Sequence, residues 1–198
     1  MVTPLLRCRA VGVGGLLVEV VDAGQALDLA LWARGRIHSV DIVPAARTVL
    51  FDGCVPERVT AVLRDWMPGG DLPEGPIVEL AVVYDGPDLA STASLIGITA
   101  EDLVEQHTAI EHVVAFCGFA PGFGYLAGSP WDVPRLEAPR PRVEPGSVGL
   151  AGTWTGAYPS ASPGGWRLIG RTEAVLWDPS RPEPALLAPG TRVRFVAR

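Results

Sequence analysis

The chain contains 198 residues, which is enough for one large domain or two small ones, because single hydrophobic cores cluster at roughly 100–150 residues. Hydrophobic residues make up 48% and charged residues 19%, which excludes a disordered chain, and the net charge of -6 argues against a basic nucleic-acid-binding protein. Every basic residue is arginine, so the chain has no Walker A lysine, no lysine Schiff base and no lysine that could carry biotin.

The cysteine count and the apolar runs narrow the chemistry further. Cys8, Cys54 and Cys117 are odd in number and far apart, so the sequence predicts neither a disulfide framework nor a paired set of metal ligands. No stretch approaches the ~18 apolar residues that a membrane span needs, and the N-terminus lacks the pattern of a signal peptide. We therefore expect a cytoplasmic protein with no bound metal, no membrane association and no nucleic-acid partner.

The first 84 residues predict short, alternating strands and helices. A glycine-rich turn over 12–15 joins the first two strands as a hairpin, Gly35 can end the first helix, and Pro56 can start the second. The order ββαββαβ predicts a small α+β sandwich with its helices on one face of a sheet. In chain order we expect strands over 5–10 and 16–20, a helix around 26–31, strands over 40–43 and 48–51, a helix over 56–66, and a strand over 77–84.

A turn cluster over 85–88 marks the expected domain boundary, which gives a domain over 1–84 and another over 85–198. Residues 118–170 hold 11 of the 23 glycines and 8 of the 19 prolines, a density that excludes long helices. We therefore expect the second domain to consist mainly of short strands and tight loops, arranged as a β-barrel. Before this region we expect helices over 89–95 and 100–106, the latter opened by Thr99 and Asp102 as a capping box, and a strand over 112–117.

The densest motif runs from Gly118 to Leu126 and carries three aromatic residues among small ones. Phe119, Phe123 and Tyr125 flank a proline-glycine turn, which suits a loop that packs its rings inward while exposing backbone to a ligand or partner. The same pattern is typical of a structural loop that plugs one end of a barrel. The glycine spacing differs from that of a dinucleotide-binding loop, so that kind of site is not predicted.

Charge and glycine together suggest an anion site in the last third of the chain. Residues 131–198 carry nine arginines against six acids, although the protein as a whole is acidic. Glycine lets backbone N–H groups approach a ligand and arginine supplies a bidentate donor, so arginines beside glycine-rich loops can bind an anion. The alternative is a solvated rim of surface arginines. Ser147 lies beside glycines, but its surroundings do not match the nucleophile elbow of hydrolases.

His107 is the histidine best placed for proton transfer near neutral pH. It lies at the end of the capped helix predicted over 100–106, just before the strand that leads into the Gly118–Leu126 loop. The helix dipole also favours an imidazolium at such a position, so a purely structural role is the alternative. His38 and His112 have no partners at metal-ligand spacing beyond the adjacent Glu111.

Taken together, these runs resemble the KipI family. Its members are known as allophanate hydrolase subunit 1, the B subunit of 5-oxoprolinase, or carboxyltransferase subdomains C and D. The resemblance covers most of residues 84–196 and is looser before them. It rests on the segments 84–89, His107, 118–123, 139–140, 146–149, Gly156, 158–159, 162–172 and 189–190.

The resemblance implies a ferredoxin-like N-terminal domain, a cyclophilin-like β-barrel and a partner, the subunit 2 or KipA-like protein. It implies a two-component hydrolase of a small amide or ureido substrate, such as allophanate or 5-oxoproline, with no covalently bound cofactor and with ATP possible in the complex. The alternative is a KipI-like inhibitor of a sensor histidine kinase that performs no chemistry of its own.

On the enzyme hypothesis, each candidate residue receives a role. His107 and Arg171, expected in one shared site, and Tyr158 would be catalytic. Substrate or anion binding would involve Arg140, Arg142, Ser162, Gly164 and Gly165. The partner would dock on Phe119, Phe123 and Tyr125, because aromatic residues commonly anchor interfaces.

Overall fold

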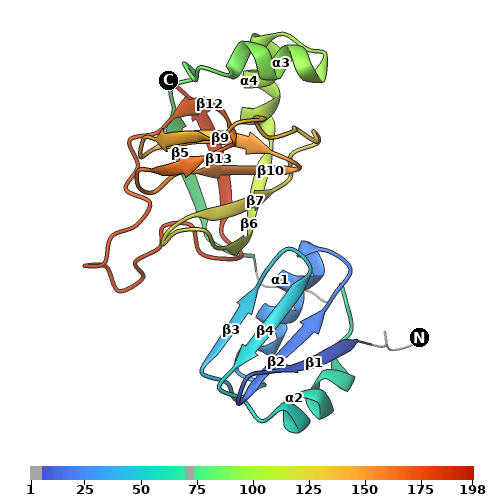
Figure 1. The fold of residues 1–198 in the computed structure, drawn as a ribbon. Helices are drawn as coiled ribbons and strands as arrows, with labels where there is room; N and C mark the ends of the chain where they lie inside the picture. The colour runs from blue at the N-terminus through green and yellow to red at the C-terminus, as the bar shows by residue number, and fades with distance from the viewer. Residues whose placement is uncertain (1–5, 70–73) are drawn as a thin grey trace. The chain divides into compact units, whose positions relative to one another are not determined.

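The computed structural model describes residues 6–69 and 74–198, and the chain divides into two compact units, Met1–Glu74 and Gly75–Arg198 (Figure 1). Each unit has a hydrophobic core of its own. Among the residues that the structure describes, no helix is both long enough and apolar enough to cross a membrane.

Four antiparallel strands form the sheet of the first unit, in the order β1-β2-β4-β3. The bounds confirm the predicted hairpin, the next two strands and both helices. Leu5, with which the first predicted strand begins, lies outside the described residues. The elements are β1 Arg7–Val11, β2 Gly15–Glu19, α1 Ala23–Ala33, β3 Asp41–Pro44, β4 Thr48–Asp52, α2 Pro56–Val62 and the 3-10 helix η1 Leu63–Asp65.

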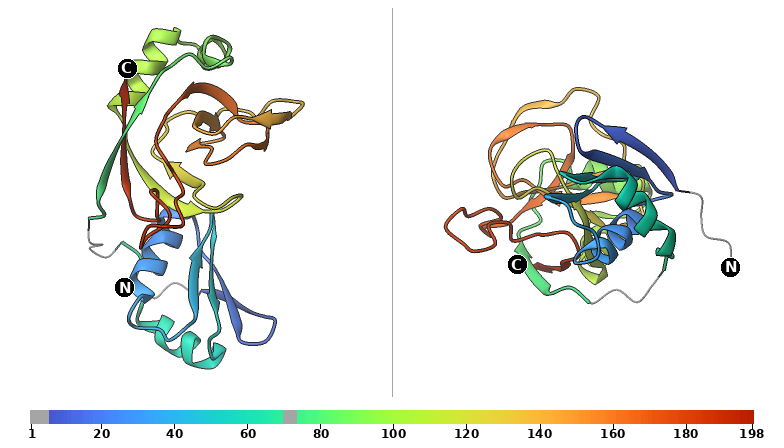
Figure 2. Two further views of the ribbon diagram at one scale, coloured as in Figure 1. Left: turned by 90° about the vertical axis from the view of Figure 1, so that its left-hand side faces the viewer. Right: turned by 90° about the horizontal axis from the view of Figure 1, so that it is seen from below.

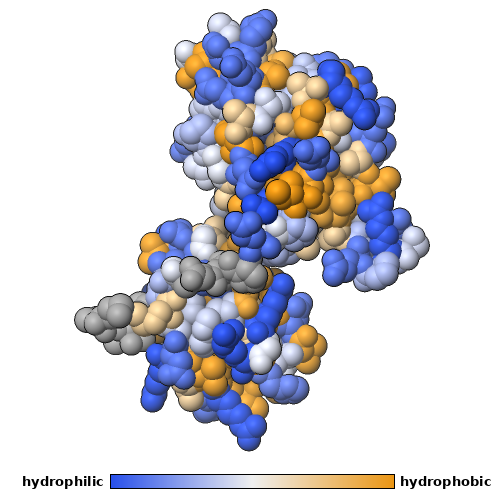
Figure 3. All heavy atoms as spheres, turned by 180° about the vertical axis from the view of Figure 1, so that it is seen from behind, coloured by the Kyte–Doolittle hydropathy of each residue, from blue (hydrophilic) through white to orange (hydrophobic). Residues whose placement is uncertain are grey.

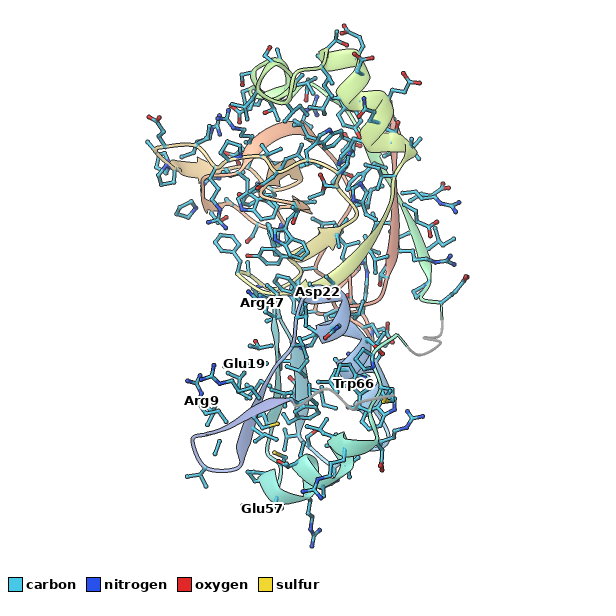
Figure 4. The ribbon with its side chains drawn as sticks, turned by 90° about the vertical axis from the view of Figure 1, so that its right-hand side faces the viewer. Arg9, Glu19, Asp22, Arg47, Glu57 and Trp66 are labelled. Atoms are coloured by element: carbon cyan, nitrogen blue, oxygen red, sulfur yellow. The ribbon has the colours of Figure 1, made fainter. Side chains whose placement is uncertain are left out.

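The core of the first unit lies between its sheet and its helices. Helix α1 begins at Asp22, whose Oδ1 accepts a hydrogen bond from the Gln25 N–H at 2.9 Å and so satisfies a free donor of the first turn (Figure 4). Leu29 of α1, Phe51 of β4 and Trp66 after η1 are fully buried in one cluster. Helix α1 packs against β3 and β4, while α2 packs against β2.

Seven strands of the second unit form one sheet, in the order β12-β9-β10-β7-β6-β13-β5. An isolated bridge between Val83 and Arg171 joins the chain after β5 to β12, so the sheet curls into a nearly closed barrel (Figure 2). This confirms the predicted β-barrel. Its strands are β5 Ile77–Val82, β6 Glu111–Cys117, β7 Gly124–Ala127, β9 Ser147–Ala151, β10 Trp154–Ala157, β12 Arg167–Arg171 and β13 Arg192–Ala197.

Two helices and a two-stranded ribbon complete the second unit. Helix α3 spans Leu89–Ile96 and α4 spans Ala100–Ala109, and the predicted capping box at the start of α4 is present. Helix α4 packs against β13, while α3 packs against α4 and β12. The ribbon pairs β8 Arg140–Val143 with β11 Ser162–Gly164.

The boundary between the units lies earlier than the sequence predicts. The predicted boundary at 84/85 assigns the strand over 77–84 to the N-terminal domain. In the structure the division follows Glu74, because β5 pairs in parallel with β13 along its whole length and so belongs to the barrel. Alternating hydrophobicity identified β5 as a strand but carried no information about its partner.

Asp88 connects three parts of the second unit that are distant in sequence. Its backbone N–H donates to the Leu168 carbonyl at 3.0 Å, and its Oδ2 accepts from the Leu168 N–H at 2.7 Å. Its Oδ1 pairs with Arg140 Nη2 at 2.7 Å. The start of α3, strand β12 and the β8–β11 ribbon are therefore held by one largely buried carboxylate.

We expect Asp88→Ala to lower the free energy of unfolding by about 3 kcal/mol. The substitution leaves the Arg140 guanidinium without its ion-pair partner and the Leu168 N–H without a hydrogen-bond acceptor. Urea unfolding followed by circular dichroism measures the change. The matched control is Asp85→Ala, which removes the exposed ion pair between Asp85 and Arg171 and should cost less than about 1 kcal/mol. Equal losses in both variants would contradict the role given to Asp88.

Candidate functional site

The Gly118–Leu126 motif folds as a tight loop between β6 and β7. Gly118 N–H donates to the Phe123 carbonyl at 3.1 Å, and Phe123 N–H donates to the Ala120 carbonyl at 3.0 Å. Among the described residues Phe119 is the only non-glycine residue with a positive φ, +70°, and it is 60% exposed. An aromatic residue rarely adopts this conformation, and such strain is concentrated at functional sites.

The aromatic rings of this loop pack edge to face with rings from other strands. Phe123 is fully buried, with ring centroids 5.1 Å from Tyr125, 5.3 Å from Tyr158 and 5.3 Å from Trp166. Phe119 contacts Phe123 from the exposed side at 5.4 Å. Phe123 therefore fills the interior, as the plug interpretation expects, while Phe119 faces solvent, and a role of the loop in binding a partner stays a prediction.

These rings surround a cavity of about 130 Å³ in the second unit. Tyr158, Gly164 and Gly165, which the sequence places in one site, do lie together here, with Gly164 as the last residue of strand β11. The absence of a side chain at Gly164 is required, because a Cβ there would lie 2.5 Å from the Tyr158 hydroxyl. The cavity is lined by Phe119, Phe123, Tyr125, Arg135, Tyr158, Gly164, Gly165 and Trp166.

Arg135 and the Tyr158 hydroxyl give this aromatic cavity its polarity. Burial raises the pKa of Tyr158, while a backbone hydrogen bond from Trp166 and the Arg135 guanidinium act in the opposite direction. The same guanidinium also opposes the burial that raises the pKa of Tyr125. The cavity therefore offers neutral phenol groups and one positive charge, which suits a small, partly apolar molecule carrying a negative charge.

The β8–β11 ribbon places two further donors near this site. Arg140 pairs across the ribbon with Gly164, and its charge reaches the Tyr158 phenol, where it lowers the pKa. Its Nη1 is buried and has no hydrogen-bond partner in the described structure, and the same holds for the Ser162 hydroxyl. Unpaired buried donors are costly, and neither Arg140 nor Ser162 lines the aromatic cavity itself.

His107 is not positioned as an accessible acid or base. It is fully buried, Tyr84 Oη lies 2.7 Å from its Nδ1, and Thr155 Oγ1 lies 3.4 Å from its Nε2. Desolvation, together with the neighbouring His112, lowers the pKa of His107 to about 3. An imidazole with this pKa is a weak base at neutral pH, so the structure favours the structural alternative.

The structure also separates His107 from Arg171, which corrects the prediction of one shared site. The Arg171 side chain is more than half exposed and pairs with Asp85 at 3.0 Å. Tyr84, the neighbour of Asp85, carries the hydroxyl that contacts the buried His107. Arg171 thus belongs to the outer surface and His107 to the interior.

Arg142 likewise lies away from the cavity lining, where its exposed guanidinium pairs with Glu144 at 2.7 Å. The sequence analysis does not single out Arg135 or Trp166, although each lies beside a segment that it does single out. Arg135 lies in the proline-rich stretch before Arg140, and Trp166 follows Gly164 and Gly165 directly. No group of three or more potential metal ligands occurs in the described ranges.

The second unit exposes several large apolar side chains. Figure 3 shows an orange hydrophobic patch on the larger unit, bordered by blue hydrophilic residues. Phe119, Val175 and Trp177 are 60%, 55% and 40% exposed. The segment with Trp177 touches the aromatic loop, because a Cβ at Gly122 would lie 2.8 Å from the Trp177 Cβ. Exposed aromatic residues beside a cavity are typical of interaction surfaces.

Comparison with known proteins matches almost the whole chain to one family. The family described as carboxyltransferase domain, subdomain C and D, matches residues 6–187. The 5-oxoprolinase B subunit of Escherichia coli O157:H7 is 50% identical over 129 residues, which is 63% of this chain and 59% of that protein. The chain therefore matches only a little over half the length of this relative.

In solved structures, too, a part of a longer chain matches almost the whole of this one. TTHA0988 superposes with a TM-score of 0.78 at 34% identity, covering 94% of this chain and 40% of that one. The Kluyveromyces lactis urea carboxylase superposes with a TM-score of 0.69 at 18% identity, covering 98% of this chain and 22% of that one. The second likeness concerns the fold alone.

The buried histidines predict a loss of stability in mild acid. Desolvation lowers the pKa of His107 to about 3 and that of His112 to about 4. Because these values lie below the ordinary 6.5, the unfolded chain takes up protons first as the pH falls, and the unfolding free energy decreases between pH 6.5 and about 4.

Between pH 7.5 and 5.5 we expect a loss of about 1.4 kcal/mol per histidine, measured by urea unfolding at the two pH values. His112→Leu should roughly halve the pH dependence, whatever its effect on stability at pH 7.5. The control His38→Gln changes an exposed histidine and should leave the dependence as in the parent. A parent protein equally stable at both pH values would contradict the neutral, buried state of the pair.

Proposed function

The chain belongs to the carboxyltransferase domain, subdomain C and D, family, and from this premise we propose that it is the B component of a two-component, ATP-dependent amide hydrolase of the 5-oxoprolinase type. Its partner on this proposal is the subunit 2 or KipA-like protein. Support comes from the curated relatives named as B subunits of 5-oxoprolinase, which are 40% to 50% identical over about 60% of the chain.

The observation that carries the proposal is the aromatic cavity. Its volume of about 130 Å³ is close to that of a 150 Å³ cavity known to hold benzene, so it matches a single small ring. 5-Oxoproline is a five-membered lactam with a carboxylate. The faces of Phe123 and Trp166 can contact such a ring, and Arg135 can pair with its carboxylate.

The polar groups at the cavity can each bind a different part of this ligand. Tyr158, neutral at pH 7 and held by the Trp166 backbone, can donate a hydrogen bond to the lactam carbonyl. The unpaired Arg140 Nη1 and Ser162 hydroxyl supply further donors toward the same end of the ribbon. These groups bind and orient an amide, and none of the residues lining the cavity is a carboxylate, histidine or thiol that could move its proton.

We therefore place the activating chemistry with the partner. The aromatic cavity is far below the roughly 300 Å³ at which cofactor sites begin, so ATP does not fit it, and the nucleotide would bind on subunit 2. On this proposal the present chain holds the amide in an aromatic setting from which water is excluded, and the partner supplies phosphoryl transfer and proton transfer. The isolated chain would show no turnover.

The finer assignments belong to the same proposal. We propose a cyclophilin-like topology for the barrel, a ferredoxin-like fold for the first unit, and a cytoplasmic location for the complex. Allophanate is the competing substrate, and a KipI-like inhibitor of a sensor histidine kinase is the competing function. Measurements on the reconstituted complex separate these outcomes.

The function is tested by copurifying the chain with its subunit 2 and measuring ATP-dependent turnover of 5-oxoproline and allophanate. We expect turnover of 5-oxoproline by the complex and none by the chain alone.

Arg135→Gln should raise KM for 5-oxoproline about tenfold with a smaller effect on kcat, since it removes a charge-assisted hydrogen bond to the bound carboxylate. Arg9→Gln, at an exposed position on β1, is the matched control and should leave both constants unchanged (Figure 4).

Turnover of allophanate but not of 5-oxoproline would show that allophanate is the substrate. A stable complex that shows no turnover but inhibits a kinase would favour the inhibitor function instead. An unchanged KM in the Arg135→Gln complex would show that the aromatic cavity is not the substrate site.

A separate prediction concerns the partner surface. We expect Phe119→Ala to weaken binding of subunit 2 by about tenfold or more, because exposed aromatic residues at the centre of an interface commonly act as hot spots. Isothermal titration calorimetry measures the affinity. Leu95→Ala alters an apolar residue of similar exposure on α3 and serves as the control. Unchanged affinity in Phe119→Ala would place the partner elsewhere on the chain.

A further inference from the structure

The first unit contains a second and larger cavity, of about 450 Å³, formed entirely by its own residues. The walls come from the turn after α1, the turn after β4 and one face of α2. This volume lies within the range of roughly 300–1,000 Å³ that is usual for small-molecule sites. Nothing in the proposed hydrolase function uses this part of the chain.

The floor of this cavity is aliphatic. Ile37 and Val59 are buried, Val62 is partly buried, and Val55 is half exposed at the edge. Cys54 adds its thiol, whose pKa is raised by burial and which donates to the Phe51 carbonyl at 3.4 Å. The thiol is therefore neutral and contributes apolar surface.

The rim carries positive charge. Arg36 and Arg58 both line the cavity and are exposed, and in the part of the chain that the structure describes neither makes an ion pair. Arg36 is held in place, since its Nη1 donates to the Trp32 carbonyl at 2.7 Å and its guanidinium carbon lies 5.3 Å from the centre of the Trp32 ring. His38 lies on the same rim.

Two carboxylates limit this charge. Asp52 and Glu57 are near enough to Cys54 to raise its pKa, although neither lines the cavity. Two guanidinium groups opposed by two carboxylates favour a singly charged ligand over a phosphate dianion. A carboxylate also matches the bidentate geometry of a guanidinium.

The lining has no aromatic ring on which a base could stack, and the face of Trp32 is occupied by Arg36. We propose that this cavity binds a small carboxylate with an aliphatic body. The aliphatic body rests against Ile37, Val59 and Val62, and the carboxylate is held by Arg36 and Arg58. The site is distinct from the aromatic cavity in its residues, its volume and the shape of its ligand.

Octanoate is the probe for this proposal, with octylamine as the equally long cation. Backbone amide NMR and isothermal titration calorimetry should show saturable binding of octanoate, with shifts at Gly53, Cys54 and Val59, and no comparable effect of octylamine. Arg58→Gln should weaken octanoate binding about five- to tenfold, because one charge-assisted contact is lost at an exposed site. Arg64→Gln, which changes an exposed arginine outside the lining, should bind like the parent.

Occlusion gives an independent test that leaves the charges in place. Val55→Trp fills the cavity from its edge and should abolish octanoate binding, whereas Val13→Trp, at a fully exposed hairpin tip, should not. No saturation up to about 10 mM octanoate, equal binding of octylamine, or an unchanged affinity in Val55→Trp would overturn the proposal. Shifts confined to Tyr125 and Trp166, or binding of AMP here without octanoate, would overturn it as well.

Discussion

The buried carboxylate of Asp88 holds together the parts from which the aromatic cavity is built. Asp88 stands at the N-cap position of α3, yet its side chain makes no capping hydrogen bond and instead accepts from Leu168 N–H and pairs with Arg140. The helix start thereby loses one local stabilising contact, and the fold gains a link between β12 and the β8–β11 ribbon. The ribbon carries Gly164, so the wall against Tyr158 depends on this link.

The same carboxylate explains why Arg140 has a free donor. One prong of its guanidinium is committed to Asp88 at 2.7 Å, and this fixes the orientation of the planar group. The other prong, Nη1, is then buried without a partner beside a phenol that its charge reaches. A flexible surface arginine would satisfy all its donors with water. A guanidinium fixed by Asp88 cannot reorient in this way, so Nη1 has no hydrogen-bond partner among the described residues.

Local patterns were sufficient to predict the elements but not their partners. The Gly12–Gly15 turn, the capping box of α4 and the alternation in β5 all predicted their structures correctly. The parallel pairing of β5 with β13 joins residues more than a hundred positions apart, and no local signal could reveal it. The domain boundary was therefore misplaced although every flanking element was right.

The candidate site shows the same limit. Tyr158, Gly164 and Gly165 are predicted to share a site because glycine lets backbone N–H groups approach a ligand, and the structure brings the three residues together. Histidine was expected to be catalytic because of its ordinary pKa, but a pKa depends on burial, which the sequence of α4 did not disclose for His107. The chain thus buries two of its histidines, His107 and His112, and lines the aromatic cavity with rings, two phenol hydroxyls and the single guanidinium group of Arg135. On the proposed function such a cavity would bind and orient the amide, and proton transfer would be left to the partner, because no carboxylate, histidine or thiol lines it.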